Sequence, residues 1–247
     1  MNCVWMILLC ACFVTVQSDK FPGSIKRCHL KDSNLDDCLT EGIQKTYELL
    51  GKGPINAISL VGIEPILIDK VVIGAGTSAV HLDQHYENVK LHGFSKSKVS
   101  KVHMDWAKKT LEYETLSPLV TQKADYDLNG KIMVFPVYGK GESTIKLSDV
   151  TMEHAVKFKE ETKGGKKYLI VDSYTLKINI NGAHYDFQNL FDGDKLLADN
   201  ILTVINENWK EVFDDVRSGI EGAYSEVCKH IANGLFTHIP YNEIFLE

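Results

Sequence analysis

Apolar residues at helical spacing first appear shortly after residue 34. Ser33 and Asn34 are residue types that favour the N-cap of a helix, and Gly51 is typical of a helix end. Between them the apolar positions recur every three to four residues: Leu35, Leu39, Ile43, Tyr47 and Leu50. This pattern predicts a short amphipathic helix over residues 35–50.

Over residues 63–189 the period of the pattern changes to two. Segments such as 102–106, 111–113, 124–128 and 176–180 alternate apolar and polar residues, which indicates strands with one face in water. Asn129-Gly130 and Gly164-Gly165 each separate two such runs and predict tight hairpin turns. The middle of the chain is therefore expected to form a long antiparallel meander.

Helical spacing returns in the last third of the chain, where no proline occurs between residue 194 and Pro240. The pattern predicts one helix of roughly 40 residues, about 60 Å long at 1.5 Å per residue, which Gly219 and Gly222 could bend. The apolar positions that recur at steps of three and four include Leu197, Ile201, Val204, Ile205, Val212, Phe213, Val216, Ile220, Tyr224, Val227, Cys228, Ile231 and Leu235.

The way these elements can pack predicts the fold. A helix of that length is longer than a compact domain of this size is wide, so it must be covered along its length, and the meander is the material available. A large antiparallel sheet with one dry face can curl around it. The expected fold is α+β: a long C-terminal helix wrapped by a strongly curved antiparallel β-sheet that encloses an elongated hydrophobic tunnel.

The first 18 residues have the character of a secretory signal peptide. They contain no charged residue, and their apolar run over residues 4–16 is too short to span a bilayer. We therefore expect residues 1–18 to be removed and residues 19–247 to form a single secreted, extracellular domain. In an oxidising compartment the near pair Cys28 and Cys38 is expected to form a disulfide. Cys228 is interpreted as a small buried residue on the helix, with an intermolecular or reactive thiol as the alternative.

Composition and charge limit the partners. The chain has 247 residues, 44% of them apolar and 24% charged, which is an ordinary globular balance. Its formal net charge is -6, and the basic residues are scattered among acidic ones. A nucleic acid or an anionic membrane surface is therefore not an expected partner.

Residues 71–80, VVIGAGTSAV, match the dinucleotide-binding pattern G-x-G-x-x-A. That pattern works when the glycine turn opens a helix within a parallel β-α-β unit. Here the following residues show no helical period and continue into alternating segments. We interpret the motif as a glycine-rich connection or bulge between strands, with a dinucleotide site as the alternative.

No catalytic or metal-binding constellation is found. His81 and His85 flank Asp83, but metal ligation at this spacing needs a helix, and the segment is predicted to be turn and strand. The nucleophile elbow, the zinc-protease motif and the P-loop motif do not occur in the sequence. We expect neither catalysis nor a cofactor or metal ion.

Several segments taken together resemble the insect takeout / juvenile hormone binding protein family. They are the leader, the early cysteine pair ahead of a short helix, ENVKLHGFSKSKV, LNGKIMVFPVYGKGE and the terminal PYNEIFLE. The resemblance covers about residues 20–247 and implies a lipid-binding domain with a tunnel for a juvenoid or another long-chain lipid. The hormone-carrier branch usually has a second disulfide from the central sheet to the C-terminal helix. No cysteine lies between Cys38 and Cys228, so the chain is identified as a takeout-like member.

Ligand binding would then consist of apolar burial with one or two polar contacts for orientation. Tyr138 is the expected polar contact, because the resemblance places a ligand-facing tyrosine at this point of the sheet. Leu39, Ile43 and Tyr47 are expected to form a gate over one tunnel end. The other expected ligand-binding residues are bulky residues on the strands and the long helix: Trp106, Leu111, Tyr113, Tyr126, Val134, Phe135, Phe158, Ile178, Phe187, Phe191, Leu197, Ile201 and Trp209.

The function expected from these observations is that of a monomeric, non-catalytic carrier of a hydrophobic small molecule in haemolymph or another extracellular fluid. A juvenile hormone-like terpenoid, a fatty acid or another long-chain lipid is the expected ligand. The alternative is a secreted interaction or regulatory protein, in which bound lipid is structural and the acidic surface engages a receptor or another protein.

Overall fold

The computed structural model describes residues 21–74, 80–132 and 134–247. The expected leader over residues 1–18 lies outside these residues. The helices and strands, with η for short 3-10 helices, are β1 (Cys28–His29), α1 (Leu35–Leu50), η1 (Asn56–Ile58), β2 (Ile66–Ile73), β3 (Val80–His92), η2 (Phe94–Lys96), β4 (Lys98–Asp105), β5 (Thr110–Ile132), β6 (Phe135–Lys163), β7 (Lys166–Asn179), β8 (Gly182–Phe187), η3 (Phe191–Gly193), α2 (Lys195–Glu207), α3 (Trp209–Phe236), α4 (Tyr241–Ile244) and β9 (Phe245–Leu246).

The large sheet has seven antiparallel strands in the order β2-β3-β5-β6-β7, with β4 added to β5 and β8 added to β6. Strands β5 and β6 are 23 and 29 residues long and pair with each other along one edge. The other edge of each is long enough to pair with two further strands, one after the other. One half of β5 pairs with β3 and the other half with β4. Register shifts place an extra residue in β3, in β4 and in β7, and such bulges bend a strand and increase its local twist.

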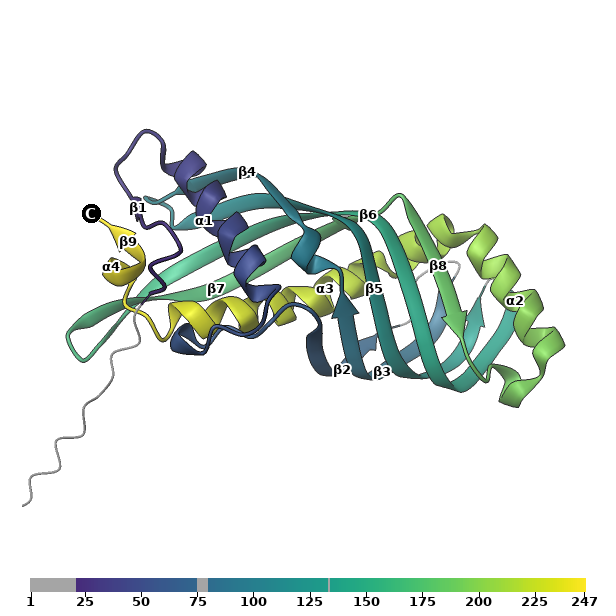
Figure 1. Cartoon of the computed structure of the whole chain (residues 1–247). Coiled ribbons are helices and arrows are strands. Elements are labelled where there is room, and N and C mark those ends of the chain that lie inside the picture. The colour runs from purple at the N-terminus through teal and green to yellow at the C-terminus, as the bar shows by residue number, and fades with distance from the viewer. Residues whose placement is uncertain (1–20, 75–79, 133) are drawn as a thin grey trace, which may run out of the picture.

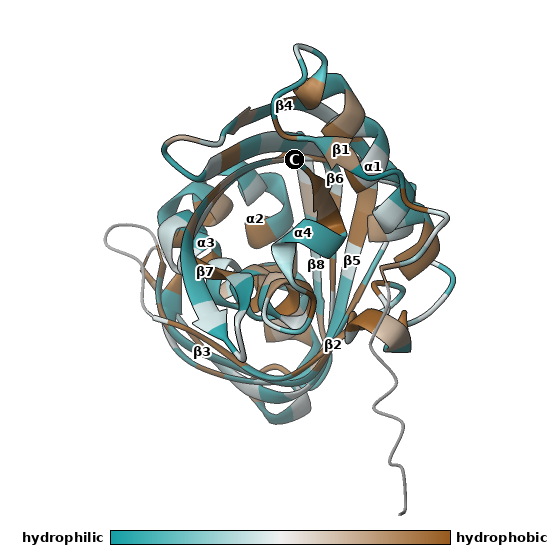
Figure 2. Cartoon of the chain, turned by 90° about the vertical axis from the view of Figure 1, so that its left-hand side faces the viewer, coloured by the Kyte–Doolittle hydropathy of each residue, from teal (hydrophilic) through white to brown (hydrophobic). Residues whose placement is uncertain are grey.

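Helix α3 runs along the inside of this curved sheet, as the views from the side and from the end show (Figures 1 and 2). The predicted fold, a long C-terminal helix wrapped by a curved antiparallel sheet, is confirmed. The prediction of a single helix of roughly 40 residues was wrong in one detail. It is divided into α2 and α3 at Asn208, whose φ of -106° and ψ of 27° are not helical, and not at either glycine. The side chain of Asn208 donates a hydrogen bond to the Val204 carbonyl, which stabilises the end of α2.

Two polar side chains of helix α1 bond the backbone at the edge of β4 that does not pair with β5. Gln44 pairs with the backbone of β4 and the residue before it, because its amide nitrogen donates to the Ser97 carbonyl and its oxygen accepts from the Val99 amide. The Asp36 carboxylate accepts from the Met104 amide and bonds the His103 ring at 2.9 Å. The apolar residues Ile43, Tyr47 and Leu50 of α1 line a cavity inside the protein, at the helical spacing read from the sequence.

Two of the local sequence interpretations have clear outcomes. Gly164-Gly165 connects β6 to β7, as predicted. Asn129-Gly130 does not form a hairpin, because β5 continues to Ile132 and the chain turns only before Phe135. Gly130 instead allows a close approach between strands: a Cβ on it would lie 2.0 Å from the His81 carbonyl oxygen.

The glycine-rich segment at residue 74 follows β2 and precedes β3, which pair with each other as antiparallel neighbours. Residues 75–79 of this motif lie outside the described residues. Since a dinucleotide fingerprint needs two parallel strands joined by a helix, the flanking strands do not provide its context. His85 and Asp83 are exposed on the outer face of β3. None of the described helices is long and apolar enough to cross a membrane.

The disulfide between Cys28 and Cys38 is present and joins β1 to α1. Strand β1 also pairs with the C-terminal strand β9, so this bond fixes α1 to both ends of the described chain. We expect the double substitution of both cysteines by alanine to lower the free energy of unfolding by about 2–3 kcal/mol, because the cross-link restricts the unfolded chain. Urea unfolding of the wild type and the variant measures this difference. An unchanged midpoint with an unchanged slope would show that the bond contributes nothing to stability.

Candidate ligand-binding cavity

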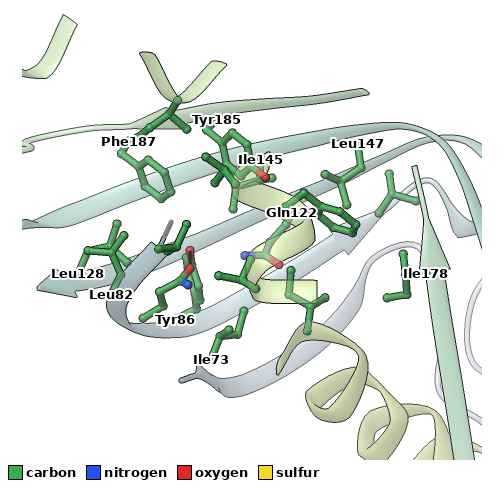
Figure 3. Close-up of a pocket in the computed structure, with 18 of the residues that line it drawn as sticks. Ile73, Leu82, Tyr86, Gln122, Leu128, Ile145, Leu147, Ile178, Tyr185 and Phe187 are labelled. Atoms are coloured by element: carbon green, nitrogen blue, oxygen red, sulfur yellow. Dashed lines mark hydrogen bonds between the residues drawn. The ribbon is translucent and has the colours of Figure 1, made fainter. Parts of the chain in front are cut away.

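The space between the sheet and α3 contains two apolar cavities that follow one another along the helix. The first has a volume of about 100 Å³ and the second about 230 Å³. Both are much larger than the 10–15 Å³ that one water molecule needs on the same measure. Figure 3 shows part of the first cavity, with Tyr185 and Phe187 of β8 on one side and Leu82 and Tyr86 of β3 on the other.

One face of α3 forms a wall of both cavities. Its lining residues follow one another at steps of one, three or four residues, which places them on a single stripe of the helix. From the first to the last of them the stripe is about 36 Å long at 1.5 Å per residue. They are Val212, Phe213, Val216, Ile220 and Tyr224 in the first cavity, and Tyr224, Val227, Cys228, Ile231, Ala232, Leu235 and Phe236 in the second.

The two cavities meet at four residues that contribute to both linings: Leu91, Phe94, Met152 and Tyr224. We call this group the waist. Leu91, Phe94 and Met152 are nearly completely buried. Tyr224 donates its hydroxyl hydrogen to the side-chain oxygen of Gln122, at 2.5 Å. At the waist the lining is therefore apolar except for Tyr224, whose hydroxyl is hydrogen-bonded to Gln122.

The second cavity has a cluster of neutral polar side chains in its wall. The two ring nitrogens of His154 lie 2.7 Å from the Tyr174 hydroxyl and 3.0 Å from the Thr115 hydroxyl. The Tyr174 hydroxyl also bonds that of Tyr113, at 2.9 Å. Tyr113 stacks on the imidazole with 4.2 Å between ring centroids. These contacts satisfy the polar groups without bringing a charge into the cavity.

Burial governs the protonation of this cluster. It lowers the pKa of His154 to about 3 and raises the pKa of Tyr113 to about 12. The pKa of the Cys228 thiol rises to about 11 for the same reason, with an opposing contribution from its hydrogen bond to Tyr174. At neutral pH the imidazole is uncharged and the thiol stays protonated, so neither group is activated as a nucleophile or cation. The cluster can provide hydrogen bonds and apolar contact.

Residues 7–246 match the model of the haemolymph juvenile hormone binding protein family. The chain belongs to this family. It is 29% identical over 252 residues to the circadian clock-controlled protein daywake of Drosophila melanogaster, covering 98% of this chain and 95% of that protein. The daywake protein of Drosophila yakuba is also 29% identical, over 236 residues, covering 92% of this chain and 89% of that protein.

Among solved structures, takeout 1 of Epiphyas postvittana superposes with a TM-score of 0.78 at 23% identity, covering 90% of this chain and all of that one. At this identity the likeness shows the shared fold. The resemblance to the takeout / juvenile hormone binding protein family stated from the sequence is confirmed.

The structure places some of the residues expected to bind ligand around the cavities of this family member. Ile178 and Phe187 line the first cavity. The second cavity is lined by Leu111, Tyr113 and Phe158, and by two of the three residues expected to form a gate, Ile43 and Tyr47. The third, Leu39, is buried one turn earlier in α1 and does not line the described cavities.

Tyr138 lies outside both cavities, because its neighbours Val137 and Gly139 occupy the inner face of β6. Val137 is 1% exposed and lines the first cavity, whereas the outward-facing Tyr138 is 43% exposed. The Tyr138 ring packs edge-on against Phe191, with centroids 5.3 Å apart. Tyr126 faces inward but donates its hydroxyl hydrogen to the Gln188 carbonyl instead of lining a described cavity.

The remaining expected ligand-binding residues also lie elsewhere. Trp106 packs against Tyr241 and Phe245 near the C-terminus. Val134 is 82% exposed in the turn between β5 and β6. Four further residues are exposed on β6 and α2 or packed into the core around α2 and α3 without lining the described cavities: Phe135, Leu197, Ile201 and Trp209.

Gln84, His154 and Tyr174 line the cavities but were not among the residues expected from the sequence. The alternation of the strands provides a signal for the first two. Gln84 is in phase with Leu82 and Tyr86, and His154 is in phase with the buried Met152 and Val156. A polar residue at an inward position of a strand is therefore a useful indicator of a cavity wall in this fold.

Proposed function

We propose that this protein is a secreted, non-catalytic carrier of a hydrophobic small molecule, held in the two adjoining cavities along α3. The observation that carries the proposal is the continuous apolar stripe of α3, which walls both cavities over about 36 Å. A juvenile hormone-like terpenoid, a fatty acid or another long-chain lipid suits such a space. Residues 19–247 would form the lipid-binding domain, and residues 1–18 would direct secretion.

Apolar burial can provide enough affinity for this role. At about 0.8 kcal/mol per buried CH₂, a ligand of roughly 15 carbons gains about 12 kcal/mol before the cost of association. With an association cost of about 4 kcal/mol, about 8 kcal/mol remains, which corresponds to a dissociation constant of about 1 micromolar. The family name and the disulfide support an extracellular carrier, since disulfides persist in oxidising compartments.

The decisive experiment expresses the full chain in insect cells and purifies the protein from the medium. Organic extraction and mass spectrometry then identify the co-purified species, and delipidated protein is titrated with juvenile hormone in competition with an apolar dye. We expect a co-purified lipid that a juvenoid or another long-chain lipid displaces at micromolar concentration or below. Protein that stays inside the cells, or that contains no lipid and binds no probe, would contradict the proposal. A lipid that cannot be exchanged would instead favour a structural role for the lipid.

A further inference from the structure

The first cavity contains one buried polar atom that has no partner. Gln84 lies on β3 between Leu82 and Tyr86, and its side chain lines the cavity although the residue is only 8% exposed. Among the described residues, its amide nitrogen Nε2 is the one buried side-chain nitrogen or oxygen without a hydrogen bond. Since buried polar groups are almost always paired, such an atom in a cavity wall points to a missing ligand.

The orientation of this amide is set by Tyr86, whose ring is completely buried. The Tyr86 hydroxyl donates to Gln84 Oε1 at 3.1 Å. The amide oxygen is therefore turned toward this hydroxyl, and the amide nitrogen is left without a hydrogen-bond partner. The reverse orientation would leave the tyrosine hydrogen and the amide oxygen both without partners. The group that remains free is therefore a neutral donor with two N–H bonds.

The rest of the lining restricts what this donor can bind. Neither cavity has a lysine, arginine, aspartate or glutamate among its described lining residues. His154 is the one titratable imidazole in the linings, and both of its nitrogens already bond neutral hydroxyls. A carboxylate carried into this space would have no opposite charge beside it, which disfavours the ionised form strongly.

We propose that Gln84 is the polar anchor of the site and that it selects uncharged lipids with an acceptor oxygen, such as an ester, ketone or epoxide, over fatty acid anions. This inference rests on the proposed carrier function and adds the chemical class of the ligand. The ligand's oxygen accepts a hydrogen bond from Gln84 Nε2, and its hydrocarbon chain lies along the stripe of α3.

The test compares three ligands of similar length on delipidated protein: methyl dodecanoate, dodecanoic acid and tridecane, each displacing the dye N-phenyl-1-naphthylamine at pH 7.5. A fatty acid with a pKa near that of a glutamate side chain, about 4.3, is ionised by roughly 1000 to 1 at this pH. We therefore expect the ester to bind at least about 100-fold more tightly than the acid. Equal affinities for ester and acid would overturn the proposal, because the carboxylate would then lie outside the cavity.

The Gln84→Leu variant tests the anchor itself. Replacing the amide by an apolar side chain of similar size is expected to lower the ratio of ester affinity to tridecane affinity about tenfold, the effect of one buried hydrogen bond. The control is His85→Leu, which adds the same side chain at the exposed neighbour on β3 and should leave the ratio unchanged. A ratio that stays the same in Gln84→Leu would contradict the assignment.

These results separate the inference from the proposed function. If no probe binds the wild type, the carrier function fails. If the wild type binds the three probes, but binds ester and acid equally and Gln84→Leu keeps the ester-to-tridecane ratio, the carrier function stands and only the assignment of Gln84 as the anchor is wrong. Thermal unfolding of both variants establishes that each is folded, and the ester-to-acid ratio of the wild type needs no variant.

Discussion

Replacing Met152 by tryptophan is expected to weaken the binding of a long ligand about 100-fold or more. Met152 lies at the waist, is nearly completely buried and contributes to the lining of both cavities. A rigid indole in place of the flexible thioether narrows the passage, so a chain that spans both cavities loses contacts on one side. The loss of about four buried CH₂ groups costs about 3 kcal/mol, which corresponds to roughly 150-fold in the dissociation constant.

The measurement is a dye-displacement titration with methyl hexadecanoate and methyl octanoate on delipidated protein. The short ester fits within one cavity, so its affinity is expected to change by less than about threefold. Overpacking can cost about 1–3 kcal/mol of stability, and thermal unfolding therefore accompanies each titration. Leu116→Trp is the matched control, because Leu116 pairs with Thr151, next to Met152, but is 43% exposed.

The comparison of the two esters decides whether the cavities act as one tunnel. A selective loss of the long ester in Met152→Trp, without a loss in Leu116→Trp, supports a ligand that passes the waist. An equal loss of both esters would place the ligand in a single cavity and contradict the spanning arrangement.

Elements with local signals could be predicted from the sequence. The helix at residues 35–50 was predicted from its N-cap residues, its apolar period and the glycine after it, and the turn at Gly164-Gly165 from its two glycines. Asn129-Gly130 has an equally strong local signal but lies inside β5. The use of Gly130 for close contact with His81 depends on the neighbouring strand, which the local sequence does not contain.

The site was harder to predict than the fold because it depends on which face of each strand turns toward α3. The aromatic run around Phe135 and Tyr138 suggested a cavity wall, but the alternation places Val137 inward and Tyr138 outward, and Phe135 is exposed at the first position of β6. For Gln84 the phase was readable from the sequence. Its unpaired nitrogen was not, because only the packed structure shows which polar groups have found partners.

The buried histidine gives the protein an expected sensitivity to acid. Burial lowers the pKa of His154 to about 3 in the folded state, whereas in the unfolded chain it should be near 6.5. Below pH 6.5 the unfolded state therefore binds a proton that the folded state does not. The free energy of unfolding should fall as the pH decreases, by about 1.4 kcal/mol per pH unit well below 6.5, and by about 3 kcal/mol in total between pH 7 and pH 4.

Urea unfolding at several pH values between 7 and 4 measures this contribution as the difference between the wild type and His154→Gln. Glutamine can keep hydrogen bonds to Tyr174 and Thr115 but does not titrate, so we expect its stability to fall less steeply with acidification. The control is His103→Gln, because the hydrogen bond that the His103 ring donates to the Asp36 carboxylate, together with the negative charge of that carboxylate, raises the pKa of His103. That contribution is present at low pH and is lost as the pH rises through the folded pKa, so this variant should not reduce the acid sensitivity. Parallel pH profiles for the wild type and His154→Gln would mean that the imidazole is already protonated, or open to water, in the folded protein.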